Sequence, residues 1–292
     1  LELEKYGIPK ITMSDGPHGL RVQKTKADNL GINESEISTC FPASASLGNT
    51  WNRELIYLLG KTLGKEARKE EVNIVLGPAI NIKRSPLCGR NFEYFSEDSY
   101  LTGILGMEYV KGLQSENVGA CVKHFAVNNQ ENRRRTIDVV IDERALREVY
   151  LKAFEMIIKN AKPWSIMSAY NKANGEYCSE NQHLLNDILR KEWGFEGHVV
   201  SDCWAIKDFH EGHMVTDTPL ESAALAMNNG CDLNCGTLFA YLKEAVEKGM
   251  VKEERLNEAL VHLFTTRMML GVFDQKGENP YDQISYEVVD SK

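Results

Sequence analysis

The sequence predicts an α/β fold, a (β/α)8-type TIM barrel in which irregular or missing strands are allowed. Short apolar segments alternate with longer helical patterns, and several of the apolar segments end in polar residues. The chain has 292 residues, a normal length for a single barrel of this kind. A doubly wound sheet is the competing architecture, but no Gly-x-Gly-x-x-Gly pattern follows a candidate strand. We therefore expect a parallel sheet covered by helices.

Short apolar segments are the candidate strands. They are Ile11–Met13, Asn73–Leu76, Ala120–Val122, Ser165–Ala169 and His198–Val200, with a further candidate near Cys231–Leu233. Longer segments carry helical patterns: Asn52–Glu70, Asp98–Glu116, Asp142–Asn160, Glu180–Trp193, Glu221–Asn228, Leu238–Lys248 and Glu253–Leu270. The polar, irregular segment Lys24–Thr39 is expected to be a surface loop.

Composition and charge exclude several classes of protein. The apolar fraction of 42% and the charged fraction of 26% are typical of a globular chain with a core. No run of about 18 uncharged apolar residues occurs, so no membrane span is expected. The net charge of −8 is opposite in sign to the bias of nucleic-acid binders. We expect neither nucleic acid nor membrane as a partner.

Seven cysteines are scattered along the chain, and no Cys-x-x-Cys pair occurs. An odd number without a dense framework favours a reducing compartment, so we expect a cytoplasmic location and leave periplasmic and secreted ones open. Cys231 and Cys235 have no nearby His, so no metal site is expected there. No motif indicates a cofactor, and none is expected.

Polar side chains stand where candidate strands end. Asp15, the pair Lys123-His124, Tyr170 and Asp202 occupy such positions, which face the catalytic rim of a barrel. Four of them have a structural alternative: Asp202 as a helix N-cap, Lys123 as a solvated cation, His124 as a hydrogen-bonded core residue, and Asp15 as the start of a turn. A barrel aldolase would use Lys123 as the Schiff base and would leave Asp202 without a clear role.

Two arginine-containing segments also have alternative interpretations. Arg90, in Gly89-Arg-Asn-Phe-Glu93, lies either in a salt-bridged loop or in a fork that a Glu holds and presents to a ligand. The run Arg133-Arg-Arg135 is typical of a solvated basic patch, and no interleaved aromatic residues favour nucleic acid.

Taken together and in order, seven segments carry a resemblance to a known family. They are Ser14-Asp-Gly-Pro-His-Gly-Leu-Arg21, Cys40-Phe-Pro42, Gly89-Arg-Asn-Phe-Glu93, Val122-Lys-His-Phe125, Asn128-Asn-Gln-Glu-Asn-Arg-Arg-Arg135, Met167-Ser-Ala-Tyr-Asn171 and Gly197-His-Val-Val-Ser-Asp202. The chain, over about residues 1–274, resembles the N-terminal barrel domain of glycoside hydrolase family 3, especially the bacterial β-glucosidases of that family.

The resemblance implies a retaining exo-β-glycosidase, most similar to a β-glucosidase, that releases the non-reducing terminal sugar through a covalent glycosyl-Asp intermediate. Asp202 matches the nucleophile of the family. The positions that match the site for the terminal sugar are Asp15, Arg90, Lys123, His124, Arg134, Met167 and Tyr170. The expected substrate is a β-linked glucoside or a short oligosaccharide. Nearby cations are expected to favour the ionised form of the nucleophile.

A retaining enzyme also needs a general acid/base, and the resemblance places it outside this chain. Two-domain relatives supply a Glu from a second, α/β sandwich domain. Single-domain relatives use a His after the Lys-His pair, but the segment Phe125–Glu131 lacks their Pro-Gly-His. We therefore expect a catalytic barrel over residues 1–274 and a linker over 275–292 towards that second domain. A homo-oligomer stays open.

The resemblance gives conflicting indications about the sugar. Cys203 follows the nucleophile where β-glucosidases have Trp, and Trp204 is displaced by one position. Together with Asp232-Leu-Asn-Cys235, this is similar to β-xylosidases, and a Cys203–Cys235 pair would narrow the space for a hexose C6 group. Asp15 is the glucosidase-type residue. A β-xylosidase or a dual β-glucosidase/β-xylosidase is the alternative, and a non-catalytic sugar-binding barrel is the alternative from another class.

Overall fold

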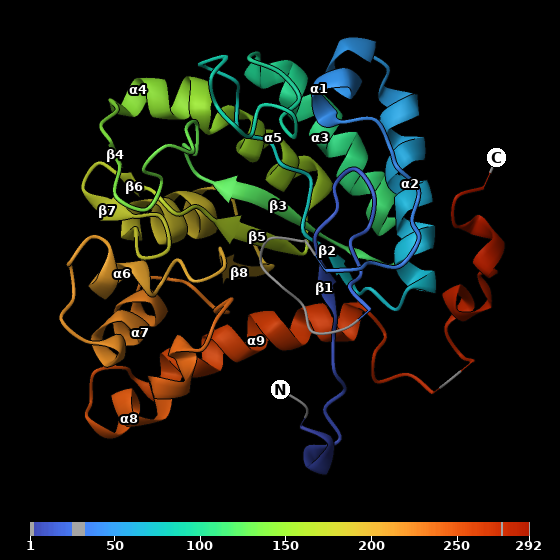
Figure 1. Ribbon diagram of the computed structural model, residues 1–292. Helices are drawn as coiled ribbons and strands as arrows, with labels where there is room; N and C mark the ends of the chain where they lie inside the picture. Colours follow the sequence, from blue (N-terminus) through green and yellow to red (C-terminus); the bar gives the residue numbers. More distant parts are fainter. Residues whose placement is uncertain (1–2, 25–32, 276, 292) are drawn as a thin grey trace.

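The computed structural model describes residues 3–24, 33–275 and 277–291. Within these residues, five parallel strands form one sheet, shown at the centre of Figure 1. Their order across the sheet is β1 (Met13–Ser14), β2 (Ile74–Val75), β3 (Gly119–Phe125), β5 (Ser165–Ser168) and β8 (His198–Ser201). The prediction of a TIM-barrel-like α/β fold with irregular strands is confirmed.

The strand order ends at β1 on one side and at β8 on the other. Beyond β8, the predicted strand near residues 231–233 is reduced to a single parallel bridge between Val200 and Leu233. At this bridge the Leu233 amide donates to the Val199 carbonyl over 3.0 Å and the Ser201 amide donates to the Leu233 carbonyl over 2.9 Å, so Leu233 runs parallel to β8. A cavity of about 530 Å³ lies between β1 and this bridge.

Three helices pack around the sheet on the side of β2 and β3: α2 (Arg53–Lys69), α3 (Ser99–Gln114) and α5 (Lys152–Ala161) (Figure 1). The helices α2 and α3 begin at Asn52 and Asp98, which cap them by accepting hydrogen bonds from backbone amides three residues on. They approach closely at Gly112, where an added Cβ would lie 2.1 Å from the Tyr57 carbonyl oxygen. Glycine is therefore required at this crossing.

Three predicted helices are interrupted or altered. The segment predicted as one helix over 142–160 consists of α4 (Glu143–Ala145), the π-helical segment η3 (Leu146–Tyr150) and α5. The helix predicted over 180–193 is the π-helical segment η4 (His183–Glu192). The one over 238–248 divides into η5 (Leu238–Tyr241) and α8 (Leu242–Glu247). An amphipathic pattern identifies the buried face, but it does not determine which carbonyl each amide bonds.

The remaining elements lie mainly at the two ends of the sheet. The helical ones are η1 (Glu4–Tyr6), α1 (Ser44–Leu47), η2 (Gly48–Thr50), α6 (Asp208–Glu211), α7 (Pro219–Asn228) and α9 (Glu253–Met269). A small second sheet, absent from the prediction, is formed by β4 (Asp138–Val139), β6 (Lys172–Ala173) and β7 (Glu176–Tyr177). Part of the predicted loop 24–39 lies outside the described residues.

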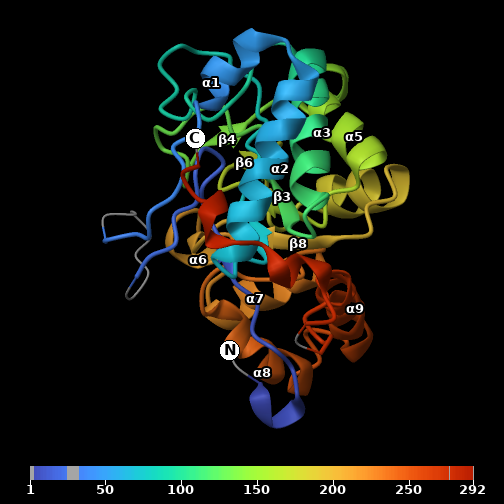
Figure 2. The same ribbon diagram turned by 90° about the vertical axis from the view of Figure 1, so that its right-hand side faces the viewer.

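The C-terminal segment runs along α2 and contains η6 (Pro280–Gln283) and η7 (Tyr286–Val288) (Figure 2). The Tyr281 hydroxyl donates to the Ser115 carbonyl over 3.1 Å, and the Asp290 amide donates to Thr39 Oγ1 over 2.9 Å. The expected role of this C-terminal segment as a linker to a second domain stays a prediction.

None of the helices in the described residues has the length and apolarity needed to cross a membrane.

Candidate active site

The fully buried strand β8 delivers Asp202 to the C-terminal edge of the sheet. The Asp202 amide donates to the Ser168 carbonyl of β5 over 3.2 Å. The preceding residue, Ser201, accepts hydrogen bonds at Oγ from the Cys235 amide (3.0 Å) and from Asn234 Nδ2 (3.2 Å). The backbone on both sides of the Asp202 carboxyl is therefore fixed by neighbouring segments.

The two oxygens of the Asp202 carboxyl have different surroundings. Oδ1 accepts a hydrogen bond from the Cys203 amide over 2.8 Å, whereas Oδ2 is buried and has no hydrogen-bond partner among the described residues. Burial raises the pKa of Asp202, and Arg90, Lys123 and Arg134 lower it by a smaller amount. The cations act in the expected direction, but burial outweighs them. Oδ2 thus has no protein hydrogen-bond donor among the described residues.

Asp15 and Lys123 form an ion pair between the ends of β1 and β3. Lys123 Nζ lies 2.8 Å from Asp15 Oδ1, and Arg21 lies 3.1 Å from Asp15 Oδ2. Burial raises the pKa of Asp15, but the charges of Lys123, Arg21 and Arg90 outweigh it and hold the pKa below its ordinary value. Asp15 is therefore an ionised acceptor, suited to sugar hydroxyl protons.

His124 is fully buried and neutral, because burial and the nearby cations Arg90 and Lys123 hold its pKa well below the ordinary value. The buried Asn81 pairs with its backbone in both directions, donating to the His124 carbonyl (2.9 Å) and accepting from the His124 amide (2.8 Å). The Arg90 guanidinium donates to the imidazole at Nε2, and this nitrogen lies 3.8 Å from Asp202 Oδ2.

Two carboxylates hold the Arg90 guanidinium. Its Nε lies 3.4 Å from Glu93 Oε1 and 3.4 Å from Glu131 Oε1. This geometry agrees with the hypothesis of an Arg fork held by a Glu. Glu131 also accepts a 2.7 Å hydrogen bond from Arg134, whose guanidinium lies 4.3 Å from the Tyr170 ring centroid. The Tyr170 hydroxyl in turn donates to the Cys203 carbonyl over 2.6 Å.

The candidate site residues share one cavity of about 510 Å³. Those that the sequence predicted are Asp15, Arg90, Lys123, His124, Arg134, Met167, Tyr170 and Asp202. The volume is within the usual range for small-molecule sites. The structure thus brings together eight residues that are separated by up to 187 positions along the chain, from Asp15 to Asp202.

Several residues that line the same cavity were not predicted as site residues. They include His18, Arg21, Glu93, Cys203 and Trp204. Neither ring nitrogen of His18 has a hydrogen-bond partner among the described residues, and burial together with the Lys123 charge lowers its pKa to about 4. The turn Ser14-Asp-Gly-Pro-His-Gly19 was the available signal, because it places His18 three residues after Asp15.

Cys203 and Cys235 form a disulfide, a pairing that the sequence left open. Both cysteines line the cavity between β1 and the Leu233 bridge, and Cys203 also lines the cavity that contains Asp202. The nearby Cys231 is buried and free. Within the described ranges, no group of three or more His, Cys, Asp or Glu side chains is placed to hold a metal ion.

Comparison with known proteins places the chain among glycoside hydrolases. Residues 8–266 match the Glycosyl hydrolase family 3 N terminal domain. The chain is 48% identical over 286 residues to thermostable beta-glucosidase B of Acetivibrio thermocellus, covering 96% of this chain and 36% of that one.

Two solved structures show the same fold. Beta-glucosidase 3B of Thermotoga neapolitana, in complex with glucose, has a TM-score of 0.82 and 42% identity, over 94% of this chain and 37% of that one. A family 3 exo-beta-xylosidase in complex with a xylobiose aziridine probe has a TM-score of 0.90 and 26% identity, over 99% and 39%. The chain spans between a third and two fifths of these proteins. It belongs to glycosyl hydrolase family 3, as an N-terminal domain of that family.

Proposed function

We propose that the protein containing this chain is a retaining exo-β-glucosidase that releases the terminal sugar of β-linked glucosides and short oligosaccharides. The observation that carries the proposal is the free Oδ2 of Asp202, which lies in a cavity lined by donors and acceptors for sugar hydroxyls. The A. thermocellus and T. neapolitana relatives, both titled beta-glucosidases, support the choice of sugar.

In the proposed first step, Oδ2 of Asp202 attacks the anomeric carbon while the bond from that carbon to the leaving oxygen breaks. The leaving oxygen takes a proton from a general acid, and a glycosyl ester of Asp202 remains. Water then attacks the anomeric carbon and gives up a proton to the same group, and the Asp202 carboxylate is released. Asp15 accepts, and Lys123 donates, hydrogen bonds at the hydroxyls of the bound sugar.

The general acid/base of the proposed reaction belongs to a second domain. The carboxyl groups lining the described cavity are those of Asp15, Glu93 and Asp202. Asp15 is paired with two cations, Glu93 with Arg90, and Asp202 is the nucleophile. The relatives are longer than this chain, which leaves room for a further domain in the whole protein.

The nucleophile is tested on the full-length enzyme with a fluorinated mechanism-based β-glucoside, followed by peptide mass spectrometry. We expect the label on Asp202. The Asp202→Asn variant is expected to lose several orders of magnitude in kcat while still binding glucose, because the amide keeps the shape but cannot form the ester. A label on any other carboxylate would remove the assignment.

A β-xylosidase, or an enzyme that accepts both sugars, is the second candidate. The Cys203–Cys235 disulfide favours this second candidate. Cys203 directly follows the proposed nucleophile and lines the cavity, so the disulfide reduces the space beside the bound sugar. The relative titled exo-beta-xylosidase has the same fold. Nitrophenol release from matched β-glucoside and β-xyloside substrates by the full-length enzyme distinguishes the two candidates.

A further inference from the structure

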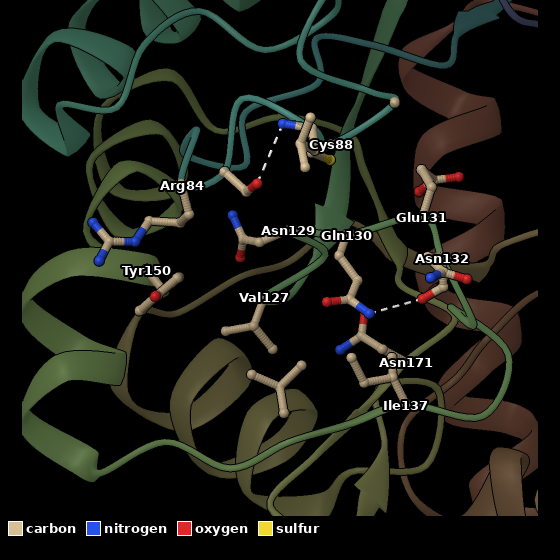
Figure 3. A pocket seen from close by; sticks show the side chains of 14 residues that line it. Arg84, Cys88, Val127, Asn129, Gln130, Glu131, Asn132, Ile137, Tyr150 and Asn171 are labelled. Carbon is tan, nitrogen blue, oxygen red and sulfur yellow. Dashed lines mark hydrogen bonds between the residues drawn. The ribbon is translucent and has the colours of Figure 1, made fainter.

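A second pocket, of about 410 Å³, is shown with its lining side chains in Figure 3. It is bounded by the loop that carries Arg84 and Gly89, by residues 127–132 after β3, by β4 and by Tyr150 of η3. It shares no lining residue with the catalytic cavity. The segments that follow β2, β3 and β5 each supply different residues to the two pockets, so both pockets lie at the same edge of the sheet.

Primary amides are the prominent polar groups of this pocket. Asn129, Gln130, Asn132 and Asn171 all line it, and Figure 3 shows the Asn129 side chain projecting into the space between Arg84, Tyr150 and Val127. The Oδ1 atoms of Asn129 and of the almost fully buried Asn171 have no hydrogen-bond partner among the described residues. Both oxygens are themselves buried, so a ligand reaches them only when the Asn129 or Asn171 side chain moves, and a hydroxyl that did so would pair an otherwise unpaired acceptor.

The rest of the lining is apolar or of mixed charge. Val127, Ile137 and Val139 supply aliphatic contacts, and the Arg84 guanidinium lies 5.8 Å from the centroid of the Tyr150 ring. One cation at one side and the Glu131 carboxylate at the other give no net preference for a charged ligand. Amides beside aliphatic surface suit a neutral polyhydroxylated ring, which presents hydroxyls at its edge and C–H groups on its faces.

We propose that this second pocket binds a neutral saccharide unit, separately from the catalytic cavity. Its ligand class follows the proposed function, and its position gives it a route to the reaction. Glu131 lines the second pocket, while its carboxylate also holds Arg90 and Arg134, which line the catalytic cavity. A sugar hydroxyl that donates to Glu131 from the second pocket competes with Arg90 and Arg134 for the carboxylate oxygens, and so weakens the contacts that hold these two arginines. Occupancy therefore changes turnover at Asp202.

The test uses the full-length enzyme with Asp202 already esterified by the fluorinated glucoside, so that the catalytic cavity is filled. Mass spectrometry verifies complete labelling, which is itself a check on the proposed function and is independent of the second pocket. Cellobiose is then titrated by calorimetry or by saturation-transfer NMR. We expect binding of one further equivalent to the labelled enzyme, and loss of that binding in Ile137→Trp, which fills the pocket.

Val140→Trp is the matched control, because Val140 is 86% exposed, lies three residues from Ile137 and does not line the pocket. It is expected to bind cellobiose as the labelled wild type does. If Ile137→Trp fails to fold, Gln130→Ala and Asn132→Ala replace it, since both side chains are exposed. Three outcomes overturn the proposal: no binding to the labelled enzyme, binding that these lining variants leave unchanged, and a pocket that holds only ordered water when crystals are soaked with cellobiose.

Discussion

At the scale of single residues, burial of the Asp202 carboxyl makes its ionised form less stable in the folded protein than in water. Burial raises its pKa above the ordinary value of 3.8, so the folded state binds a proton more tightly than the unfolded state does. The contribution of this carboxyl to stability is then fully present at low pH and is lost as the pH rises through the folded pKa. At neutral pH the ionised Asp202 carboxylate therefore destabilises the fold, as buried charged groups at functional sites commonly do.

Replacing Asp202 by Asn is therefore expected to stabilise the protein at neutral pH. The amide has no charge to desolvate, so the melting temperature of the variant should exceed that of the wild type at pH 7. The gain should shrink as the pH falls towards the ordinary aspartate pKa, because the wild-type carboxyl is then protonated in both states. Calorimetric melting curves between pH 4 and pH 8, run on variant and wild type in the same buffers, measure the effect, and a gain independent of pH would contradict it.

Glu93 has two possible roles in the reaction, as a general acid or as a residue that positions Arg90. Burial raises its pKa, and it lines the same cavity as Asp202. A carboxyl with a raised pKa could act as a general acid, but Glu93 lies 3.4 Å from Arg90 Nε and is suited to hold that guanidinium. We expect Glu93→Gln to lower kcat/KM by roughly tenfold to a hundredfold, the usual effect of weakening a hydrogen bond to a charged group.

The leaving group separates these two roles of Glu93. A positioning role predicts the same loss for aryl glucosides with good and with poor leaving groups, and no rescue by azide. Loss confined to poor leaving groups, with azide restoring turnover, would identify Glu93 as the acid/base and would place the whole reaction within this chain.

Asp15 carries the prediction about the sugar. Its ion pairs with Lys123 and Arg21 make it an ionised acceptor, and in the proposed function we expect it to contact hydroxyls far from the scissile bond. A site that hydrogen-bonds a hydroxyl discriminates strongly against substrates that lack it. We expect Asp15→Ala to lower turnover of both β-glucosides and β-xylosides, with the larger loss on glucosides, while Asp15→Asn, which keeps the size, loses less on both. Equal losses on the two sugars, with wild-type preference for the xyloside, would favour the xylosidase alternative.

At the scale of elements, the sequence predicted the strands that position the site, but it did not predict the small second sheet or the pairing at the outer edge of β8. The alternation of apolar runs and polar ends located β3, β5 and β8, because buried parallel strands must be apolar throughout. The segment near residues 231–233 was expected as a strand, but it pairs with β8 through the single bridge at Leu233, and the length of such a pairing leaves no periodic signal in the sequence. The short strands β4, β6 and β7 have only two residues each, too few for any alternation to be read.

The Cys203–Cys235 disulfide joins the segment after β8 to the segment that follows the Leu233 bridge. It closes a loop across a sequence separation of 32 residues, and a loop of this size is worth roughly 2–4 kcal/mol of stability. We expect the double variant Cys203→Ser/Cys235→Ser to lose that amount of unfolding free energy in urea denaturation. Its activity on β-glucosides should also rise relative to β-xylosides, because the backbone beside the sugar is no longer cross-linked and leaves more space. The buried free Cys231 supplies the control: Cys231→Ser should leave the sugar ratio unchanged.

The same disulfide bears on the location of the protein. Disulfides persist in oxidising compartments, so the pair is relevant to the cytoplasmic location expected from the cysteine count, which stays a prediction with periplasmic and secreted locations open. Thiol titration of the native enzyme under denaturing conditions, without reductant, measures how many of its cysteines are paired.

For the whole molecule, the sequence predicted the class of fold and the main site residues, whereas the network that sets their ionisation needed the structure. Asp15, Lys123 and Asp202 could be placed on one rim because the carboxyl ends of parallel strands share an edge. Glu131 could not, since a single Glu in a polar loop is indistinguishable from a solvated one. Its contacts with Arg90 and Arg134 depend on how the loops after β2 and β3 meet.

The proposed division of the reaction between this chain and a second domain leads to the last prediction. A protein made of residues 1–292 alone is expected to bind glucose and to release nitrophenol slowly from aryl β-glucosides with good leaving groups. Asp202 can still attack in such a protein, and a good leaving group needs little proton donation. On cellobiose the same protein should be nearly inactive, because the departing sugar hydroxyl must be protonated and each carboxyl described in the cavity already has another role. Adding azide, which attacks the glycosyl ester without base assistance, should speed release from the aryl substrate and leave cellobiose uncleaved. Cellobiose hydrolysis at an ordinary enzymatic rate would contradict the prediction and would direct the search for the acid back to Glu93.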